Sequence, residues 1–216
     1  MYYIHTLYKM QEYTNIDHNK VFFQIGTNTG VDEFRELVGK YTPSFVVLVE
    51  PWCEFNASIE KSYLNINKKL INGVVGRDHN KQSIIYLPDN NKDRRAHSTL
   101  IPMQDWDYDI SPGYPTTTYN FNNICQEEGI TEIELLMLDT EGYDFIILDS
   151  INFTKINVKN IIHESWEFNT ESCYKNYEDV NLLGVKGQQY IKNKLLKLGF
   201  TYNGIHNNNC FFTKNI

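Results

Sequence analysis

Lys20-Val-Phe-Phe-Gln-Ile-Gly-Thr-Asn-Thr-Gly30 is predicted to be an apolar strand that runs directly into a glycine-spaced turn. The apolar half is typical of a strand that is buried on both faces of a parallel sheet. The turn requires glycine, because a backbone that adopts positive φ or approaches a ligand closely has no room for a Cβ atom. The spacing Gly26-x-Asn28-x-Gly30 lacks the third glycine of dinucleotide-binding turns. The stretch therefore indicates a nucleoside-type cofactor, with an ordinary strand-to-helix turn as the alternative.

Length and composition narrow the class of protein. The 216 residues suffice for one domain with a full core and are too few for two. The net charge of -7 argues against nucleic acid as a partner, because a phosphate backbone normally needs a basic surface. The 4 cysteines include no Cys-x-x-Cys pair, which argues against a zinc or dithiol site. No apolar run approaches the roughly 20 residues that span a bilayer, and the first residues do not resemble a signal peptide, so we expect a soluble, cytoplasmic protein.

Predicted strands alternate with predicted helices along the chain. The expected buried strands are Val21–Ile25, Phe45–Glu50, Lys69–Gly76, Glu134–Asp139 and Asn160–Glu164. The expected helices are Val31–Tyr41, Glu54–Leu64, Tyr119–Glu128, Phe145–Ser150 and Gly187–Leu198. An extra edge strand is expected at Ser83–Leu87, a long loop at residues 88–115, and a final hairpin from Phe200–Gly204 and Cys210–Thr213.

This alternation predicts an α/β fold with right-handed crossovers. We expect a Rossmann-like, doubly wound, mostly parallel sheet in three α/β/α layers, which ends in an antiparallel C-terminal hairpin. Residues 21–216 are expected to form this single domain, and residues 1–20 an edge helix or a lid. Ligands of such sheets bind at the carboxyl ends of the strands, near the point where the strand order reverses. The polar residues that end the strands are therefore the candidates for chemistry.

Polar residues end each of these strands. Glu50 closes the second strand about 20 residues after the glycine turn, where an acidic side chain can accept both hydroxyls of a ribose. A surface carboxylate is the alternative, although a charge that ends a fully apolar strand needs a partner. Asn72 and Gly73 lie at the end of the third strand, and His163 and Glu164 end the fifth. We expect these residues to lie along one edge of the sheet.

The stretch Leu138-Asp139-Thr-Glu141-Gly142-Tyr-Asp144 is the second dense group of polar residues. Two carboxylates that are two residues apart, on a turn closed by glycine, suit acid/base work, a metal ion or a cationic ligand. An aspartate that caps the following helix is the simpler interpretation, and it is compatible with the others.

Together these stretches resemble the FkbM-type methyltransferases, which use S-adenosylmethionine and mostly methylate hydroxyl groups of sugars and glycosylated products. The resemblance runs from about Val21 to Phe212. It implies a class I methyltransferase fold and a sugar or glycan acceptor. The elements that carry it are Gln24 to Gly30, Glu50-Pro51, Asp139 to Asp144, and Ile-Ile-His163-Glu164.

The resemblance also implies roles for single residues. Gln24, Gly26, Thr27, Asn28 and Gly30 would bind the methionine part of the cofactor, Glu50 and Pro51 the ribose, and Asn72 and Gly73 the adenine. Asp139 would lie beside the methyl group. This sequence departs from the family pattern at two positions. Gln24 replaces an acidic residue that often contacts the amino group of the cofactor, and Met137 replaces a lysine, which changes how the Asp139 carboxylate is held.

Methyl transfer to a sugar hydroxyl needs a base. A protonated hydroxyl is a poor nucleophile, and a positioned base accelerates such a reaction by roughly 10² to 10⁴ fold. We expect Asp139 or His163 to be this base, with Glu141 and Glu164 orienting the site; a core histidine is the alternative for His163. A divalent metal held by Asp139, Glu164 and His163 is an alternative that we do not favour.

Three aromatic residues are candidate platforms for the apolar face of a sugar, with core packing as the alternative: Trp106 and Tyr114 in the long loop, and Trp166 after the fifth strand. Two other functions stay open. An NAD-dependent oxidoreductase is opposed by the missing third glycine, and a non-catalytic glycan-binding or assembly module fits the two departures. The asparagine-rich composition suggests a large virus or an AT-rich microbe, with the host cytoplasm as location if viral. The chain is also a candidate part of a larger glycosyltransferase polypeptide.

Overall fold

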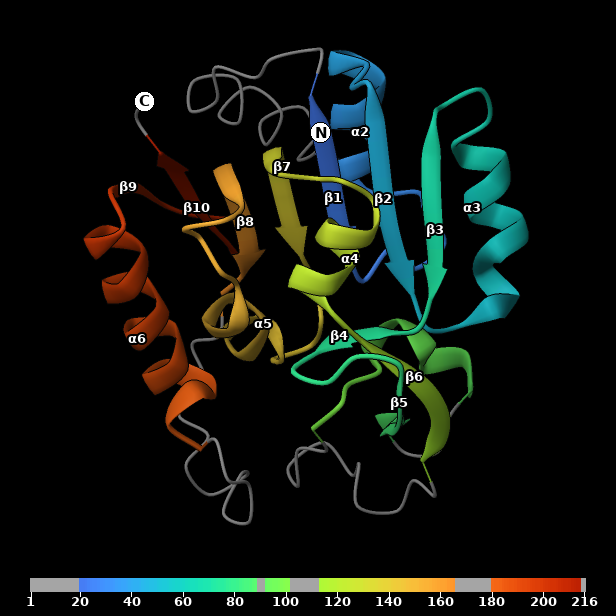
Figure 1. The fold of residues 1–216 in the computed structure, drawn as a ribbon. Coiled ribbons are helices and arrows are strands. Elements are labelled where there is room, and N and C mark those ends of the chain that lie inside the picture. The colour runs from blue at the N-terminus through green and yellow to red at the C-terminus, as the bar shows by residue number, and fades with distance from the viewer. Residues whose placement is uncertain (1–19, 89–91, 102–112, 166–179, 215–216) are drawn as a thin grey trace.

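The computed structural model describes residues 20–88, 92–101, 113–165 and 180–214 (Figure 1). These residues form a seven-stranded sheet with the strand order β3-β2-β1-β7-β8-β10-β9. The first five strands in this order are parallel, and β10 runs antiparallel to both of its neighbours. The expected fold class, a doubly wound and mostly parallel sheet with an antiparallel C-terminal hairpin, is confirmed.

The elements have the following bounds. The strands of the large sheet are β1 Val21–Ile25, β2 Phe45–Glu50, β3 Lys68–Asn72, β7 Glu132–Leu138, β8 Asn157–Glu164, β9 Phe200–His206 and β10 Asn209–Lys214. The α-helices are α2 Glu33–Tyr41, α3 Asn56–Ser62, α4 Phe121–Glu127, α5 Asp144–Ser150 and α6 Gly184–Lys197. Short 3-10 helices are η1 Cys53–Phe55, η3 Lys92–His97 and η6 Val180–Leu182.

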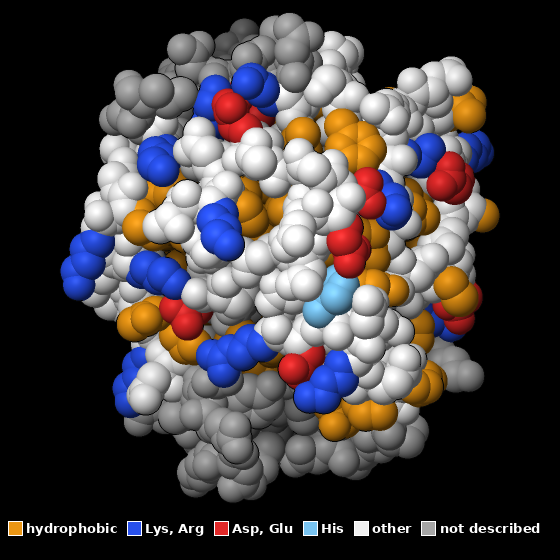
Figure 2. All heavy atoms as spheres, in the orientation of Figure 1, with side chains coloured by type: hydrophobic (Ala, Val, Ile, Leu, Met, Phe, Trp, Pro, Cys, Tyr) orange, Lys and Arg blue, Asp and Glu red, His pale blue; other side chains and the backbone are white. Residues whose placement is uncertain are grey.

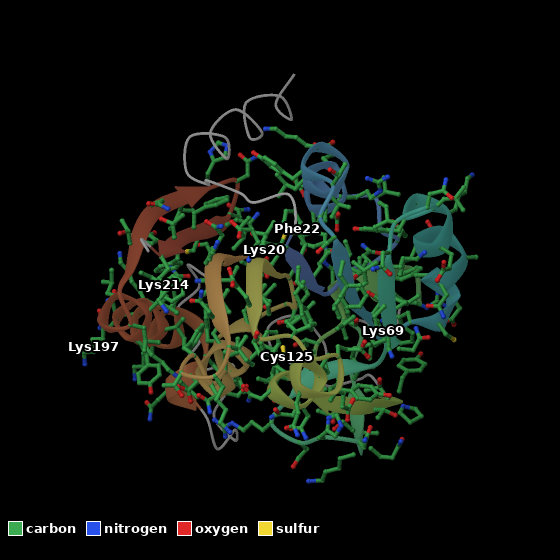
Figure 3. The ribbon with its side chains drawn as sticks, turned by 45° about the horizontal axis from the view of Figure 1, so that its top comes forward. Lys20, Phe22, Lys69, Cys125, Lys197 and Lys214 are labelled. Carbon is green, nitrogen blue, oxygen red and sulfur yellow. The ribbon has the colours of Figure 1, made fainter. Side chains whose placement is uncertain are left out.

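Helices cover both faces of the sheet, because successive side chains of a strand point to opposite faces and the strands are nearly continuous apolar runs. On β1, Phe22 belongs to one buried cluster with Phe34 of α2 and Ile59 of α3, whereas Phe23 belongs to the other with Phe121 of α4 and Phe145 of α5. Figure 3 marks Phe22 beside β1 and Cys125 beside α4. The two clusters of buried residues make the three α/β/α layers.

The strand order reverses between β1 and β7. After β1 the chain builds β2 and β3 on one side, and it returns to β1 with β7 on the other side. The loops that leave β1 and β7 therefore diverge at their carboxyl ends and open a crevice between them. This reversal sets the position of the candidate site.

A second, three-stranded sheet was not predicted. It has the order β4-β6-β5, with the bounds β4 Val74–Gly76, β5 Lys81–Ile85 and β6 Tyr114–Asn120. The prediction of a single third strand at Lys69–Gly76 was wrong. The chain leaves the large sheet at Gly73, and Val74 pairs with Thr118 of the small sheet. The packing at the bend requires glycine, because a Cβ at Gly73 would lie 2.4 Å from the Thr117 carbonyl oxygen.

The helix expected from Tyr119 begins two residues later. Tyr119 and Asn120 end β6, whose three consecutive threonines favour a strand. Asn120 is the N-cap of α4, where its side-chain oxygen accepts hydrogen bonds from the backbone N–H groups of Asn122 and Asn123. The helix boundary is therefore fixed by a cap that the sequence pattern left inside the helix.

The N-terminal segment expected to form an edge helix or a lid, residues 1–20, lies outside the described residues except for Lys20. None of the helices in the described part of the chain has the length and apolar character needed to cross a membrane. On the described part of the face in Figure 2, lysine and arginine side chains are spread among acidic, hydrophobic and uncharged ones, without a continuous basic surface.

Candidate active site

A pocket lies at the carboxyl ends of β1, β2 and β7, where the strand order reverses. Its walls come from the turn after β1, the end of β2, the bend at Gly73, the turn after β7, and residues 92–101, which we call the strap. The lining residues include Gly26, Asn28, Glu50, Pro51, Gly73, Val74, Ile85, Arg95, Ser98, Thr99, Leu100, Asp139, Thr140 and Tyr143.

The glycine turn is packed directly against the end of β7. Gly26 has a φ of +85°, and a Cβ on it would lie 1.9 Å from the Asp139 carbonyl oxygen. The backbone N–H of Asp139 donates in turn to the Ile25 carbonyl at 3.0 Å. Gly30, with a φ of +71°, packs against Ile59 and Tyr63 of the α3 region. Glycine is thus required at position 26 by the protein itself, in addition to any need of a ligand.

Glu50 holds this turn from the neighbouring strand. Its Oε2 accepts a hydrogen bond from the Asn28 backbone N–H at 2.7 Å, and its Oε1 accepts one from the Trp52 backbone N–H at 3.0 Å. Asn28 itself has a φ of 50°. Glu50 is 3% exposed, and burial raises its pKa to about 7 despite the two hydrogen bonds, with a smaller effect from Asp139. Each oxygen already has one donor and retains a lone pair for a hydroxyl group in the pocket.

The turn after β7 places Asp139 in the pocket. Asp139 is an exposed residue, and it lines the pocket. The surrounding protein desolvates its carboxyl, which raises the pKa above the ordinary value, and the charges of Asp144, Asp32 and Glu33 raise it further. The fully buried Asp144 holds this turn through hydrogen bonds. Its Oδ1 accepts from the backbone N–H of Thr140 at 3.0 Å and from the Thr140 hydroxyl, and its Oδ2 accepts from the Glu164 backbone N–H at 3.0 Å.

Glu141 is in the left-handed region, with a φ of 52°, which is strained for a residue other than glycine or asparagine. Two strap residues hold it in place. Thr99 Oγ1 donates to the Glu141 carbonyl at 3.0 Å, and His97 Nδ1 lies 3.2 Å from Glu141 Oε1. Burial, followed by the charges of Asp139 and Asp144, raises the pKa of Glu141 to about 8.

The strap is also attached on the β2 side of the pocket. Trp52 Nε1 donates to Ser98 Oγ at 2.9 Å, and the Arg95 guanidinium lies 5.5 Å from the centroid of the Trp52 ring. Thr99 pairs with Tyr86 through two backbone hydrogen bonds. Sequence analysis missed these strap residues; the only signal was the length of the predicted loop, since long loops are often functional.

Gln24 points away from the pocket, toward α2. Its Nε2 donates to Asp32 Oδ2 at 2.6 Å, and Asp32 is the N-cap of that helix. Gln24 is 1% exposed and does not line the pocket. Within the described part of the chain, the side-chain oxygen Oε1 of Gln24 has no hydrogen-bond partner. Its contact with the cofactor stays a prediction, and its observed contact secures the start of α2.

His163 is packed in the core. Its ring stacks on Phe212 with centroids 5.7 Å apart, meets the Phe145 ring edge-on at 5.5 Å, and its Nδ1 donates to the Glu164 carbonyl at 2.8 Å. Burial lowers the pKa of His163 to about 4. Neither His163 nor Glu164 lines the pocket, so the geometry favours the core-histidine alternative over the role of base.

The remaining predicted residues are divided between the pocket and its surroundings. Thr27 is buried behind the turn, with its hydroxyl 3.3 Å from the Val49 carbonyl. Asn72 pairs side chain to side chain with Asn56, outside the lining. Tyr114 meets the Trp52 ring edge-on at 5.3 Å. Trp106 and Trp166 lie outside the described residues.

The alternative of a metal site requires Asp139, Glu164 and His163 to lie together. The structure does not bring these three together at the pocket, because His163 and Glu164 lie outside its lining. Among the described residues, no group of three histidine, cysteine, aspartate or glutamate side chains has an arrangement that could hold a metal ion.

Comparison with known proteins gives a family and a fold. A sequence model described as "Methyltransferase FkbM domain" matches residues 24–202. The crystal structure of a methyltransferase FkbM from Methylobacillus flagellatus KT is similar, with a TM-score of 0.53, 11% identity, and coverage of 92% of this chain and 44% of that one. A fibrillarin pre-rRNA processing protein from Methanococcus jannaschii has a TM-score of 0.41 and 12% identity, over 91% and 66% of the two chains. No curated protein sequence matches the chain.

Proposed function

Because this chain belongs to the FkbM methyltransferase family, we propose that it transfers the methyl group of S-adenosylmethionine to a hydroxyl group of a sugar or glycan. The observation that carries the proposal is the pocket at the reversal of strand order, which the glycine turn, Glu50 and Asp139 line together. In such a pocket the ribose hydroxyls of a nucleoside would donate hydrogen bonds to the Glu50 carboxyl, and a sulfonium group would lie near the negative charge of the carboxylates.

The residues of the pocket fit the cofactor. The Glu50 carboxyl, with one lone pair left on each oxygen, would bind the two ribose hydroxyls. The apolar side chains of Val74, Ile85 and Leu100 would bury the adenine ring. The turn from Gly26 to Gly30 would hold the methionine part, where the Asn28 backbone is kept in position by Glu50.

The proposed reaction asks the protein for positioning and for proton transfer. The cofactor supplies a methyl group that its sulfonium already activates. Holding the acceptor oxygen in line with that group can contribute about 7 to 11 kcal/mol. Asp139 lines the pocket, and its raised pKa suits a base that works near neutral pH, so its carboxylate would accept the hydroxyl proton as the new oxygen–carbon bond forms. Glu141 would orient this carboxylate from the same turn.

The strap would exclude water from the reacting atoms. It is tied to Trp52 on one side of the pocket and to Glu141 on the other. Tyr114 lies against Trp52 and remains a candidate platform for the sugar, as do Trp106 and Trp166 outside the described residues. The support for a sugar acceptor is the resemblance of the sequence motifs to sugar-modifying members of the family.

The chain spans 44% of the length of the FkbM structure to which it is similar. We include in the proposal that the domain works as one part of a larger glycosyltransferase polypeptide. In such an arrangement, the glycan made by one domain would be the acceptor of the other.

The test is mass spectrometry of candidate oligosaccharides incubated with the protein and isotope-labelled S-adenosylmethionine. We expect a labelled methyl group on a sugar hydroxyl. Asp139→Asn should lower the rate by about 10² to 10⁴ fold while cofactor binding is retained. Asp149→Asn is the matched control, because Asp149 pairs with Lys194 outside the pocket lining. Binding of NAD instead would support an oxidoreductase, and binding of neither cofactor would support a non-catalytic module.

A further inference from the structure

Two carboxyl groups, Glu50 on β2 and Asp139 on the turn after β7, line the pocket. The charges of Asp144, at the start of α5, and of Asp32 and Glu33, at the start of α2, raise the pKa of Asp139, and Glu141 lies on the same turn as Asp139. Two described groups that can carry positive charge approach them, Arg95 and His97, both from the strap. Arg95 lies over Trp52 and 3.7 Å from Glu54, so among the described residues His97 is the group able to carry positive charge that is seen in contact with this set of carboxyls.

In the contact between His97 and Glu141 the carboxyl is the shielded partner, because the Glu141 side chain is 13% exposed and the His97 side chain is 51% exposed. The Glu141 backbone is held in a strained conformation by Thr99. Strain of this kind persists where several contacts determine one geometry, and it is concentrated at functional sites. The chain has a counterpart in His79 and Glu127, whose side chains approach to 2.9 Å, but there the carboxyl is the exposed partner, at 59%, and the histidine side chain is 17% exposed. Solvent screens the charge of a carboxyl exposed to that extent, so its pair contributes little.

We propose that His97 is a positioning residue for the methyl transfer: its Nδ1 holds the Glu141 carboxyl, and its protonated form offsets the negative charge of that carboxyl, so that the neighbouring Asp139 stays ionised and can accept the hydroxyl proton. This inference rests on the proposed function. Two nearby carboxyls titrate as a pair, and a cation in contact with one of them makes ionisation of both easier. Without the imidazole, the second carboxyl of the pair loses its proton only at higher pH.

Two variants separate charge from hydrogen bonding. His97→Ala removes both, and His97→Asn keeps a neutral amide near the position of Nδ1. The acid limb of the pH profile of kcat should move to higher pH by about one unit in both variants, which lowers kcat about 10-fold near pH 7. Above about pH 9 the rates should return to that of the unchanged protein. The control is Glu127→Gln, which should leave the profile unchanged.

A second measurement does not depend on turnover. In protein with ¹⁵N-labelled histidine and no cofactor, Glu141→Gln should change the Nδ1 resonance of His97, and Glu127→Gln should not. An unchanged Nδ1 resonance in Glu141→Gln overturns the inference.

The remaining outcomes are also decisive. A rate that falls equally at every pH in His97→Ala, or a full return of the profile in His97→Asn, shows a role in structure or hydrogen bonding alone and overturns the inference. If the unchanged protein methylates no hydroxyl acceptor, the proposed function fails, and the role of His97 fails with it. If the protein is active and His97→Ala has the same profile, only the role of His97 fails.

Discussion

Carboxyl groups at the pocket have pKa values above their ordinary range because the protein shields them from water. The pKa is about 7 for Glu50, about 8 for Glu141 and about 6 for Asp144. A carboxyl with a raised pKa binds more protons in the folded protein than in the unfolded chain. Its contribution to stability is therefore present at low pH and is lost as the pH rises from the unfolded value to the folded one.

We therefore expect the free energy of unfolding to fall as the pH rises from about 5 to 8, with Glu50 alone accounting for on the order of 3 kcal/mol. Urea unfolding at a series of pH values checks this. Glu50→Gln should flatten the fall. A free energy that rises over the same range would mean that these carboxyls are not desolvated as described.

Asp144 supports the Asp139 turn through hydrogen bonds to Thr140 and Glu164. Asp144→Ala should lower the free energy of unfolding by about 2 to 4 kcal/mol, because it removes the acceptor of two partly buried backbone N–H groups and of the Thr140 hydroxyl. Asp144→Asn keeps one acceptor oxygen and should cost clearly less. Urea unfolding of both variants at pH 6 measures the difference, and equal losses would show that these hydrogen bonds do not hold the turn.

Single residues show where sequence reasoning ends. Glu50, Gly26 and Asp139 were predicted as site residues, and they line one pocket, because the residues that end parallel strands necessarily meet at one edge. The orientation of Gln24 and the packing of His163 between Phe145 and Phe212 depend on which face of the sheet each side chain occupies. The contact of His97 with Glu141 joins residues 44 positions apart, and no local pattern indicates it.

At the scale of elements, the turn after β1 is where the structure tolerates least change. Gly26→Ala should destabilise the protein by more than about 3 kcal/mol and abolish cofactor binding, because its Cβ would overlap the Asp139 carbonyl. Gly129→Ala is the matched control. Gly129 has a φ of +67° but no atom within 4 Å of the added Cβ, so only the backbone strain of about 1 to 2 kcal/mol is expected. Similar losses in both variants, measured by thermal unfolding, would contradict the close packing of the turn on β7.

The strands of the large sheet were predictable because burial on both faces leaves continuous apolar runs, as in Val21–Ile25 and Phe45–Glu50. The small sheet was not predictable in the same way. Val74 to Gly76 continues the apolar run of β3, and only the bend at Gly73, fixed by Thr117 and Tyr119, directs it to a different partner. The separation of β3 from β4 depends on the pairing of β4 with the distant β6. Local composition does not predict such pairing.

At the scale of the molecule, the order of the strands explains why these residues form one site. Reversal between β1 and β7 opens the crevice, and the small sheet with the strap forms its other wall. The family match over residues 24–202 includes every described element from β2 to α6. The fold and most of the residues that line the pocket therefore lie within the part of the chain that matches the family.

The central claim is that this pocket binds S-adenosylmethionine. Isothermal titration calorimetry tests it with S-adenosylmethionine, S-adenosylhomocysteine and NAD as ligands, on the unchanged protein, on Glu50→Ala and on the control Asp149→Ala. We predict saturable binding of the first two ligands and none of NAD. The affinity should be weaker by at least about 10-fold in Glu50→Ala and unchanged in Asp149→Ala, since the Glu50 carboxyl would accept hydrogen bonds from the ribose hydroxyls. Absence of S-adenosylmethionine binding to the unchanged protein, or equal affinity in Glu50→Ala, would contradict the claim.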